Sequence, residues 1–196
     1  MMSLDLRALL IAMGEGEGNP TTAALLQLSD LSREQMRTFR QVWPQLPAHR
    51  RRLLAQLLVE LAEASFEAHF NAILRACLED SDAQVRASAI QGLWEDQDAS
   101  LVGPLLRMIH TDPAVEVRTA AAQGLGRFVL LGELEELDSR IAHRVVEDLL
   151  RVIHSPAEAI EVRFAAEPLN PSRFARNRRS RQYSRQRTTM KTRPCG

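Results

Sequence analysis

The chain has 196 residues, of which 45% are hydrophobic and only 5% are aromatic, a composition that suits closely stacked helices with aliphatic cores. No apolar run approaches the roughly 18 residues of a membrane-spanning helix, and the run at 8–13 is too short for a secretory signal. Two cysteines imply no disulfide framework, so we expect a cytoplasmic protein.

The formal net charge of zero hides a division of the chain into two parts. Residues 1–170 hold 16 arginines and all 25 acidic residues, a net charge of −9, whereas residues 171–196 hold eight arginines, Lys191 and no acid. A basic segment with almost no apolar periodicity is typical of a disordered tail. We therefore predict a folded body followed by an arginine-rich tail at 171–196.

Residues 1–46 are predicted to form an N-terminal helical extension. Short helices are expected at 3–13, at 21–28 and from Ser32 to Trp43. Three glycines and a proline make the segment 14–20 a linker. Ser32 followed by Gln35 resembles a capping box, which marks the start of the third helix.

Two helices at 48–63 and 66–78 have the length of one helix pair. Pro47 lies where the first turn of a helix tolerates proline, and leucines then form an apolar stripe. Three arginines at 50–52 are the basic cluster of the body. We expect them to be a solvated first turn; a contact with an anion or an acidic partner is the alternative.

A sequence repeat follows these helices and organises the rest of the chain. The pattern Val85-Arg86-x-x-Ala89-x-x-Gly92-Leu93 returns 32 residues later as Val117-Arg118-x-x-Ala121-x-x-Gly124-Leu125. A period in the thirties is typical of solenoids built from helix pairs. Glycine inside a helix costs about 1 kcal/mol relative to alanine. Its presence twice in one register predicts that another helix passes too close for a side chain.

The repeat places three helices at 82–94, 99–110 and 112–129, where Asp112 and Pro113 form a start signal. An acidic insertion at 130–138 follows. Because long loops of solenoids often face a partner, it is a candidate contact; a helix extension with a solvated turn is the alternative. Two more helices are expected, one lined by Ile141, Val145, Leu149 and Val152 and one at 157–167.

These motifs resemble bacterial HEAT-repeat proteins of the HEAT-like, or phycobilisome-lyase-like, kind. The resemblance rests on the run described above and on Asp-x5-Arg, present as Asp80 with Arg86 and as Asp112 with Arg118. It implies that these four residues form a hydrogen-bonded ladder between neighbouring repeats. A third copy at Val162-Arg163 departs from the pattern, because Ala157 occupies the position of the aspartate.

We therefore predict an all-α fold, a short right-handed α-solenoid of about three HEAT-like helix pairs at 47–170 with the N-terminal extension. The resemblance implies a concave surface lined by the second helix of each pair. Exposed polar residues there are the candidates for binding another protein: Glu67, Asn71, Arg75, Arg107, Arg144, Glu147, Asp148 and Arg151. The predicted function is that of a non-catalytic protein–protein interaction scaffold.

Two other functions stay open. The arginines and aromatic residues of the tail 171–196 could bind nucleic acid. The family label also covers chromophore lyases, although no residue supports pigment attachment. The histidines show no metal-binding spacing, and no catalytic motif is present, so we expect no enzyme activity, metal or cofactor. Cys77 is expected to be a buried structural thiol.

The last predicted helix lacks a mate. Its apolar residues Ile160, Val162 and Phe164 need a surface to cover them, and no apolar second helix follows. Three explanations are open: the tail is a binding arm, another chain supplies the cap, or the C-terminal sequence is not native to the repeat.

Overall fold

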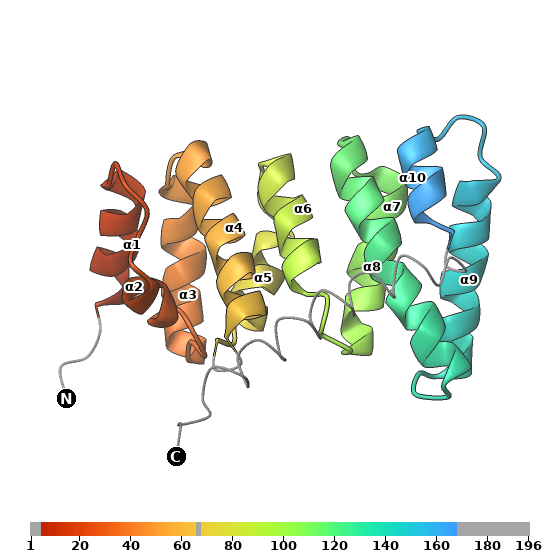
Figure 1. The fold of residues 1–196 in the computed structure, drawn as a ribbon, viewed down its shortest axis with the longest axis horizontal. Coiled ribbons are helices and arrows are strands. Elements are labelled where there is room, and N and C mark those ends of the chain that lie inside the picture. The colour runs from red at the N-terminus through yellow and green to blue at the C-terminus, as the bar shows by residue number, and fades with distance from the viewer. Residues whose placement is uncertain (1–4, 66–67, 168–196) are drawn as a thin grey trace, which may run out of the picture.

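The computed structural model describes residues 5–65 and 68–167, which form helices and connecting turns and contain no strand. The predicted tail at 171–196 and the candidate Glu67 lie outside these residues. Ten α-helices occur in the described part of the chain (Figure 1): α1 (Leu6–Glu15), α2 (Thr22–Leu26), α3 (Arg33–Val42), α4 (Ala48–Ala64), α5 (Asn71–Cys77), α6 (Ala83–Gly92), α7 (Val102–Thr111), α8 (Val115–Glu133), α9 (Ser139–Ile153) and α10 (Ile160–Ala165).

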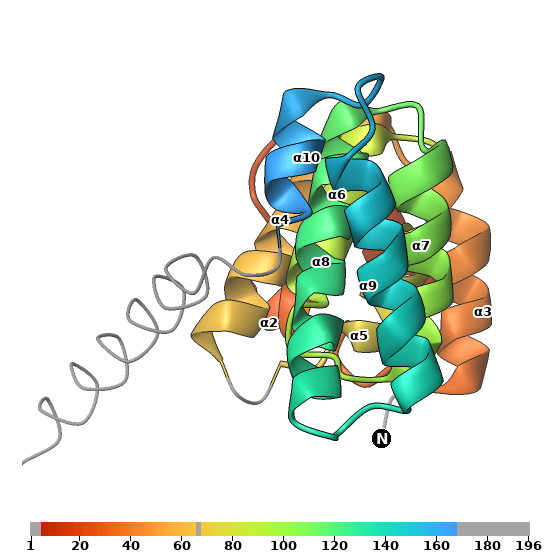
Figure 2. The same ribbon diagram turned by 90° about the vertical axis from the view of Figure 1, so that its right-hand side faces the viewer.

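The helices stack in two layers along the long axis of the molecule (Figures 1 and 2). The first layer contains α1, α4, α6, α8 and α10, each of which packs against the next along the chain. The second layer contains α3, α5, α7 and α9. Each second-layer helix also packs against the first layer, as α3 does against α1 and α7 against α8. This arrangement confirms the prediction of an all-α solenoid.

The helices of segment 1–46 continue these two layers. Helix α1 packs against α3 and α4, and α3 packs against α5. One hydrophobic core runs through the whole stack, from Leu6 in α1 to Ala166 after α10. The Gly-rich linker therefore connects helices that belong to the same core.

Local signals fix where several helices begin. The Ser32 hydroxyl accepts the Gln35 N–H and the Gln35 side chain accepts the Ser32 N–H, which confirms the capping box. Asp82 caps α6 by accepting the N–H groups of Gln84 and Val85. The start of α8 differs from the prediction, because Asp112 accepts the Ala114 N–H and the helix begins later, at Val115.

The two repeated glycines lie where neighbouring helices approach closely, as their register predicts. A Cβ atom on Gly92 would lie 2.7 Å from Val59 of α4 and 2.8 Å from Leu74 of α5. A Cβ atom on Gly124 would lie 3.3 Å from Ile90 and 3.4 Å from Leu105. Small residues therefore allow close stacking in both repeats, with the tighter approach at Gly92.

The acidic insertion forms the end of a helix and a turn. Helix α8 continues past Val129 to Glu133, and α9 begins at Ser139 with Asp138 as its N-cap. The position of Gly132 requires a small residue, because a Cβ atom there would lie 2.5 Å from the Cβ of Ala142 in α9. The alternative of a helix extension with a solvated turn is therefore the one that the structure shows.

At the C-terminal end, α10 buries only part of its apolar surface. Val162 is fully buried against the last helix pair, whereas Ile160 and Phe164 are 52% and 54% exposed. The sequence predicted that all three would need a covering surface. For Val162 that surface is provided by the stack itself.

Candidate protein-binding surface

The sequence predicted that the arginine cluster at 50–52 is a solvated first turn, which is wrong for two of its three members. Arg52 is exposed and pairs with Asp82, whereas Arg50 and Arg51 are buried. Arg50 and Arg51 are 4% and 6% exposed. Arg50 donates hydrogen bonds to the carbonyl oxygen of Met13 in α1, 2.8 Å away, and to that of Gly18 in the following linker, 3.1 Å away. The prediction failed because these acceptors lie 37 and 32 residues away in the sequence.

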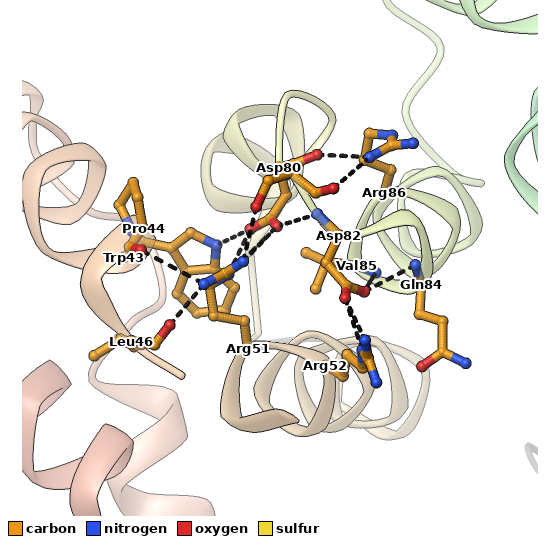
Figure 3. A network of polar contacts seen from close by, with 11 residues as sticks. Trp43, Pro44, Leu46, Arg51, Arg52, Asp80, Asp82, Gln84, Val85 and Arg86 are labelled. Atoms are coloured by element: carbon orange, nitrogen blue, oxygen red, sulfur yellow. Dashed lines mark hydrogen bonds and ion pairs between the residues drawn. The ribbon is translucent and has the colours of Figure 1, made fainter. Parts of the chain in front are cut away.

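Arg51 joins α4 to the segment that precedes α6 (Figure 3). Its guanidinium donates to both carboxylate oxygens of Asp80, with a shortest distance of 3.0 Å. The same carboxylate accepts the Trp43 indole N–H at 2.7 Å and the Asp82 N–H at 2.8 Å. All of these donors bind the same buried carboxylate, that of Asp80. The network therefore fixes how α4 and α6 stack.

The same kind of pair recurs at the next two junctions of the first layer. Arg86 of α6 binds Asp112, before α8, through two hydrogen bonds of 2.8 Å. Arg118 of α8 binds Glu158, before α10, at 2.8 Å. The structure thus joins two of the four proposed ladder residues, Arg86 and Asp112, to each other. It joins Asp80 to Arg51 and Arg118 to Glu158. We call the three ion pairs Arg51–Asp80, Arg86–Asp112 and Arg118–Glu158 the ladder.

The ladder arginines lower the pKa values of two of its carboxyls. Burial raises the pKa of Asp112, but hydrogen bonds from Arg86 and the Ala114 N–H outweigh it, so the pKa lies below its ordinary 3.8. Burial also raises the pKa of Glu158, but hydrogen bonds from Arg118 and the Ala159 N–H outweigh it, so this pKa lies below its ordinary 4.5. Both groups are therefore charged at neutral pH.

Four of the candidate binding residues form a network on α9. Asp148 is 7% exposed and lies at the centre of this network. It accepts a hydrogen bond from Arg151 at 2.7 Å, lies 3.2 Å from the His110 ring of α7, and lies 4.0 Å from Arg144. Arg144, Glu147 and Arg151 have side chains that are 66–72% exposed. These helices therefore hold exposed charges around one buried carboxylate.

The other candidates are spread along the second layer. Asn71 of α5 and Arg107 of α7 are exposed. Arg75 is already engaged, because it donates to Asp96 and Ser100, each at 2.8 Å, and pairs with Asp98. Its contacts tie α5 to the turn before α7, so its role in the structure is to hold the stack together.

Comparison with known families adds to this geometry. Residues 71–167 match the family model for HEAT repeats. This is a HEAT-repeat protein. HEAT repeats generally mediate protein–protein interaction and are typically non-catalytic. No curated protein and no solved structure matches the chain.

Sequence reasoning missed several charged residues of this HEAT-repeat stack. Arg33, Arg37 and Arg40 are exposed along α3 in the second layer, at a spacing of i, i+4 and i+7 that could have revealed them. His110 lies in the last turn of α7, and its ring lies beside Asp148 of α9. The arginines of α3, α7 and α9 together make the second layer of the stack rich in exposed positive charge.

The first layer of the HEAT repeats differs in charge. A shallow groove of about 450 Å³ lies over α6, α8 and α10, and its lining includes Gln91, Gln123 and the glutamates Glu116 and Glu161. Neither glutamate pairs with an arginine among the described residues. The groove over α6, α8 and α10 therefore offers glutamates to a partner, whereas α3, α7 and α9 offer exposed arginines.

Other chemistry has little support in the described residues. In 5–65 and 68–167, no three His, Cys, Asp or Glu side chains gather as a metal site requires. No helix in these ranges is long and apolar enough to cross a membrane. Cys77 is 1% exposed, and burial, with the nearby negative charge of Asp80, raises the pKa of its thiol. It is therefore a poor nucleophile.

Proposed function

We propose that this protein is a non-catalytic scaffold that binds another protein through the exposed surface of α7 and α9. One observation supports this proposal above all. Arg144 and Arg151 are exposed on α9 around the buried carboxylate of Asp148, and Arg107 is exposed on the neighbouring α7. The buried carboxylate holds the arginines of α9 in place but leaves their outer donors open to a partner.

The arrangement favours a partner with carboxylate and amide groups. Arg151 is held between Asp148 at 2.7 Å and Glu147 at 3.7 Å, so part of the entropy cost of ordering its side chain is already met. Glu147 remains exposed and can accept a hydrogen bond. The net charge of −9 on residues 1–170 disfavours long-range attraction of nucleic acid to this surface and favours a protein partner.

The experiment is affinity capture with the full chain, followed by direct binding measurements with each captured protein. The Arg144→Glu/Arg151→Glu double variant should weaken a specific complex by at least about tenfold, because it replaces attraction with repulsion at two contacts. Arg107→Glu on the neighbouring helix should weaken the same complex to a smaller extent. Thermal unfolding of each variant checks that the stack remains folded.

The matched control is Arg37→Glu/Arg40→Glu on α3. It makes the same change in net charge and also lies in the second layer, but it is at the opposite end of the molecule (Figure 1). This control should bind as the unmodified chain does. Equal losses in the two double variants would show that overall charge, rather than the surface of α7 and α9, governs binding.

A further inference from the structure

The ladder has a direction along the first layer. In each ion pair the arginine belongs to one first-layer helix, and the carboxylate belongs to the segment just before the next one. Each of these carboxylates also accepts a backbone N–H near the start of that next helix, from Asp82, Ala114 or Ala159. Every junction from α4 to α10 therefore needs an arginine on its N-terminal side and a carboxylate on its C-terminal side.

Arg163 is the next arginine of this series. Val162-Arg163 in α10 repeats Val117-Arg118 in α8, and Val162 is fully buried as Val117 is. Arg163 is half-buried, yet it pairs with no carboxylate in the described part of the chain. The sequence after Glu167 contains no aspartate or glutamate side chain, so residues 168–196 cannot supply one.

The surface around Arg163 has the apolar character of an interface. Ile160 and Phe164 of α10 are 52% and 54% exposed, and Leu150 of α9 is 45% exposed. These residues lie on the last helices of the stack, where a further repeat would pack (Figure 1). Covering large apolar side chains of this kind favours association. The C-terminal end of the solenoid thus combines an arginine without its carboxylate and an exposed apolar surface.

The opposite end of the molecule carries the complementary group. Helix α1 is the first helix of the first layer, and Asp5 comes directly before it. The Asp5 carboxylate is exposed, accepts the Ala8 N–H at 3.2 Å, and pairs with no arginine of the described residues. Ile11 of the same helix is 36% exposed. Asp5 is the N-cap of α1, whereas Asp80, Asp112 and Glu158 lie one or two residues before the N-caps of their helices. What the four carboxylates share is a position at the start of a first-layer helix.

We propose that copies of this chain associate head to tail, with α1 of one copy stacked on α10 of the next and Arg163 paired with Asp5 across the junction. The contact continues both the ladder and the apolar core from one copy into another. Because it joins two different surfaces, it does not close on itself as a two-fold dimer does. It would produce open chains that grow with concentration, or a ring if the rotation between copies closes.

The experiment is sedimentation velocity of the full chain over a wide range of concentrations. The unmodified chain should show an average mass that rises with concentration. Arg163→Asp and Asp5→Arg should each raise the dissociation constant at least about tenfold, because each places like charges across the junction. An equimolar mixture of these two variants should recover association, since every mixed junction again pairs opposite charges.

Two controls separate the junction from general effects. Arg140→Asp changes an arginine that is 92% exposed outside the ladder, and it should associate as the unmodified chain does. Asp5→Asn keeps an efficient N-cap for α1 but removes the charge, so it should weaken association without unfolding the helix. A chain that stays monomeric at all concentrations, or a variant mixture that fails to recover association, would overturn the proposal.

Discussion

The junction of α4 with α6 and the junction of α8 with α10 are built on the same type of ion pair but bury it to different extents. The side chains of Arg51 and Asp80 are 8% and 2% exposed, whereas those of Arg118 and Glu158 are both 16% exposed. Asp80 also accepts the Trp43 indole N–H, and Glu158 has no aromatic donor in the described residues. The loss of one partner should therefore cost more at the first junction, where the remaining charge is less accessible to water.

The glycines show the same trend in packing. A side chain on Gly92 would meet atoms at 2.7 Å and 2.8 Å, and a side chain on Gly124, one repeat later, would meet atoms at 3.3 Å and 3.4 Å. The approach is therefore tighter at Gly92 than at the equivalent Gly124 one repeat later, whereas Gly132, between α8 and α9, again leaves no room for a side chain.

The largest expected effect is that of Asp80→Ala. It leaves the buried Arg51 guanidinium without its carboxylate and the Trp43 N–H without its acceptor, which should lower the free energy of unfolding by about 3–5 kcal/mol. Urea unfolding followed by circular dichroism measures the change. Glu147→Ala, at a side chain that is 66% exposed, is the control and should cost about 0.5 kcal/mol or less.

Alanine at the two glycines should have an effect of intermediate size. Gly92→Ala gains about 1 kcal/mol of helix propensity but should lose about 1–3 kcal/mol through overpacking against Val59 and Leu74. Gly124→Ala has nearly enough room and should be neutral or slightly stabilising. Melting temperatures of the two variants compare them directly; equal values would contradict the difference in packing.

Glu158→Gln tests the more exposed end of the ladder. Arg118 remains partly hydrated when its partner loses its charge, so the free energy of unfolding should fall by only about 1 kcal/mol. The measurement is urea unfolding at neutral pH under the conditions used for Asp80→Ala. A loss as large as that at Asp80 would show that burial does not set the strength of the ladder pairs.

The smallest expected effect is a pH dependence of the difference in free energy of unfolding between the unmodified chain and Glu158→Gln. The pKa of Glu158 is lowered in the folded state, so its ion pair stabilises the fold fully above its ordinary pKa of 4.5. The advantage of the unmodified chain over Glu158→Gln should shrink as the pH falls through the lowered pKa. Unfolding curves at several acidic pH values measure this, and a constant difference would rule out the assigned shift.

The helix pairs and their close contacts could be predicted because the information is local. Glycine at i+7 in a repeated run, the Ser32 capping box and the apolar stripes all act within a few turns of one helix. The role of segment 1–46 was harder to predict, because its linker interrupts the periodicity while its helices continue the stack. The proposed domain boundaries and the binding surface remain predictions.

The long-range partners could not be found from spacing. Arg50 and Arg51 look like a solvated helix start in sequence, and only the fold brings Met13 and Asp80 to them. Glu158 was missed because it lies one residue beyond the expected position, which Ala157 occupies. A longer glutamate side chain can offset such a shift, and a pattern of fixed spacing does not allow for it.

The buried thiol of Cys77 can report how often the stack opens near α5. An alkylating reagent can reach this sulfur only when α5 separates from its neighbours, because the side chain is 1% exposed. In a chain with Cys195 replaced by serine, the rate of alkylation would therefore count the openings of the stack near α5. A partner that binds one end of the solenoid and stabilises the stack should lower the rate of Cys77 alkylation without contacting the cysteine.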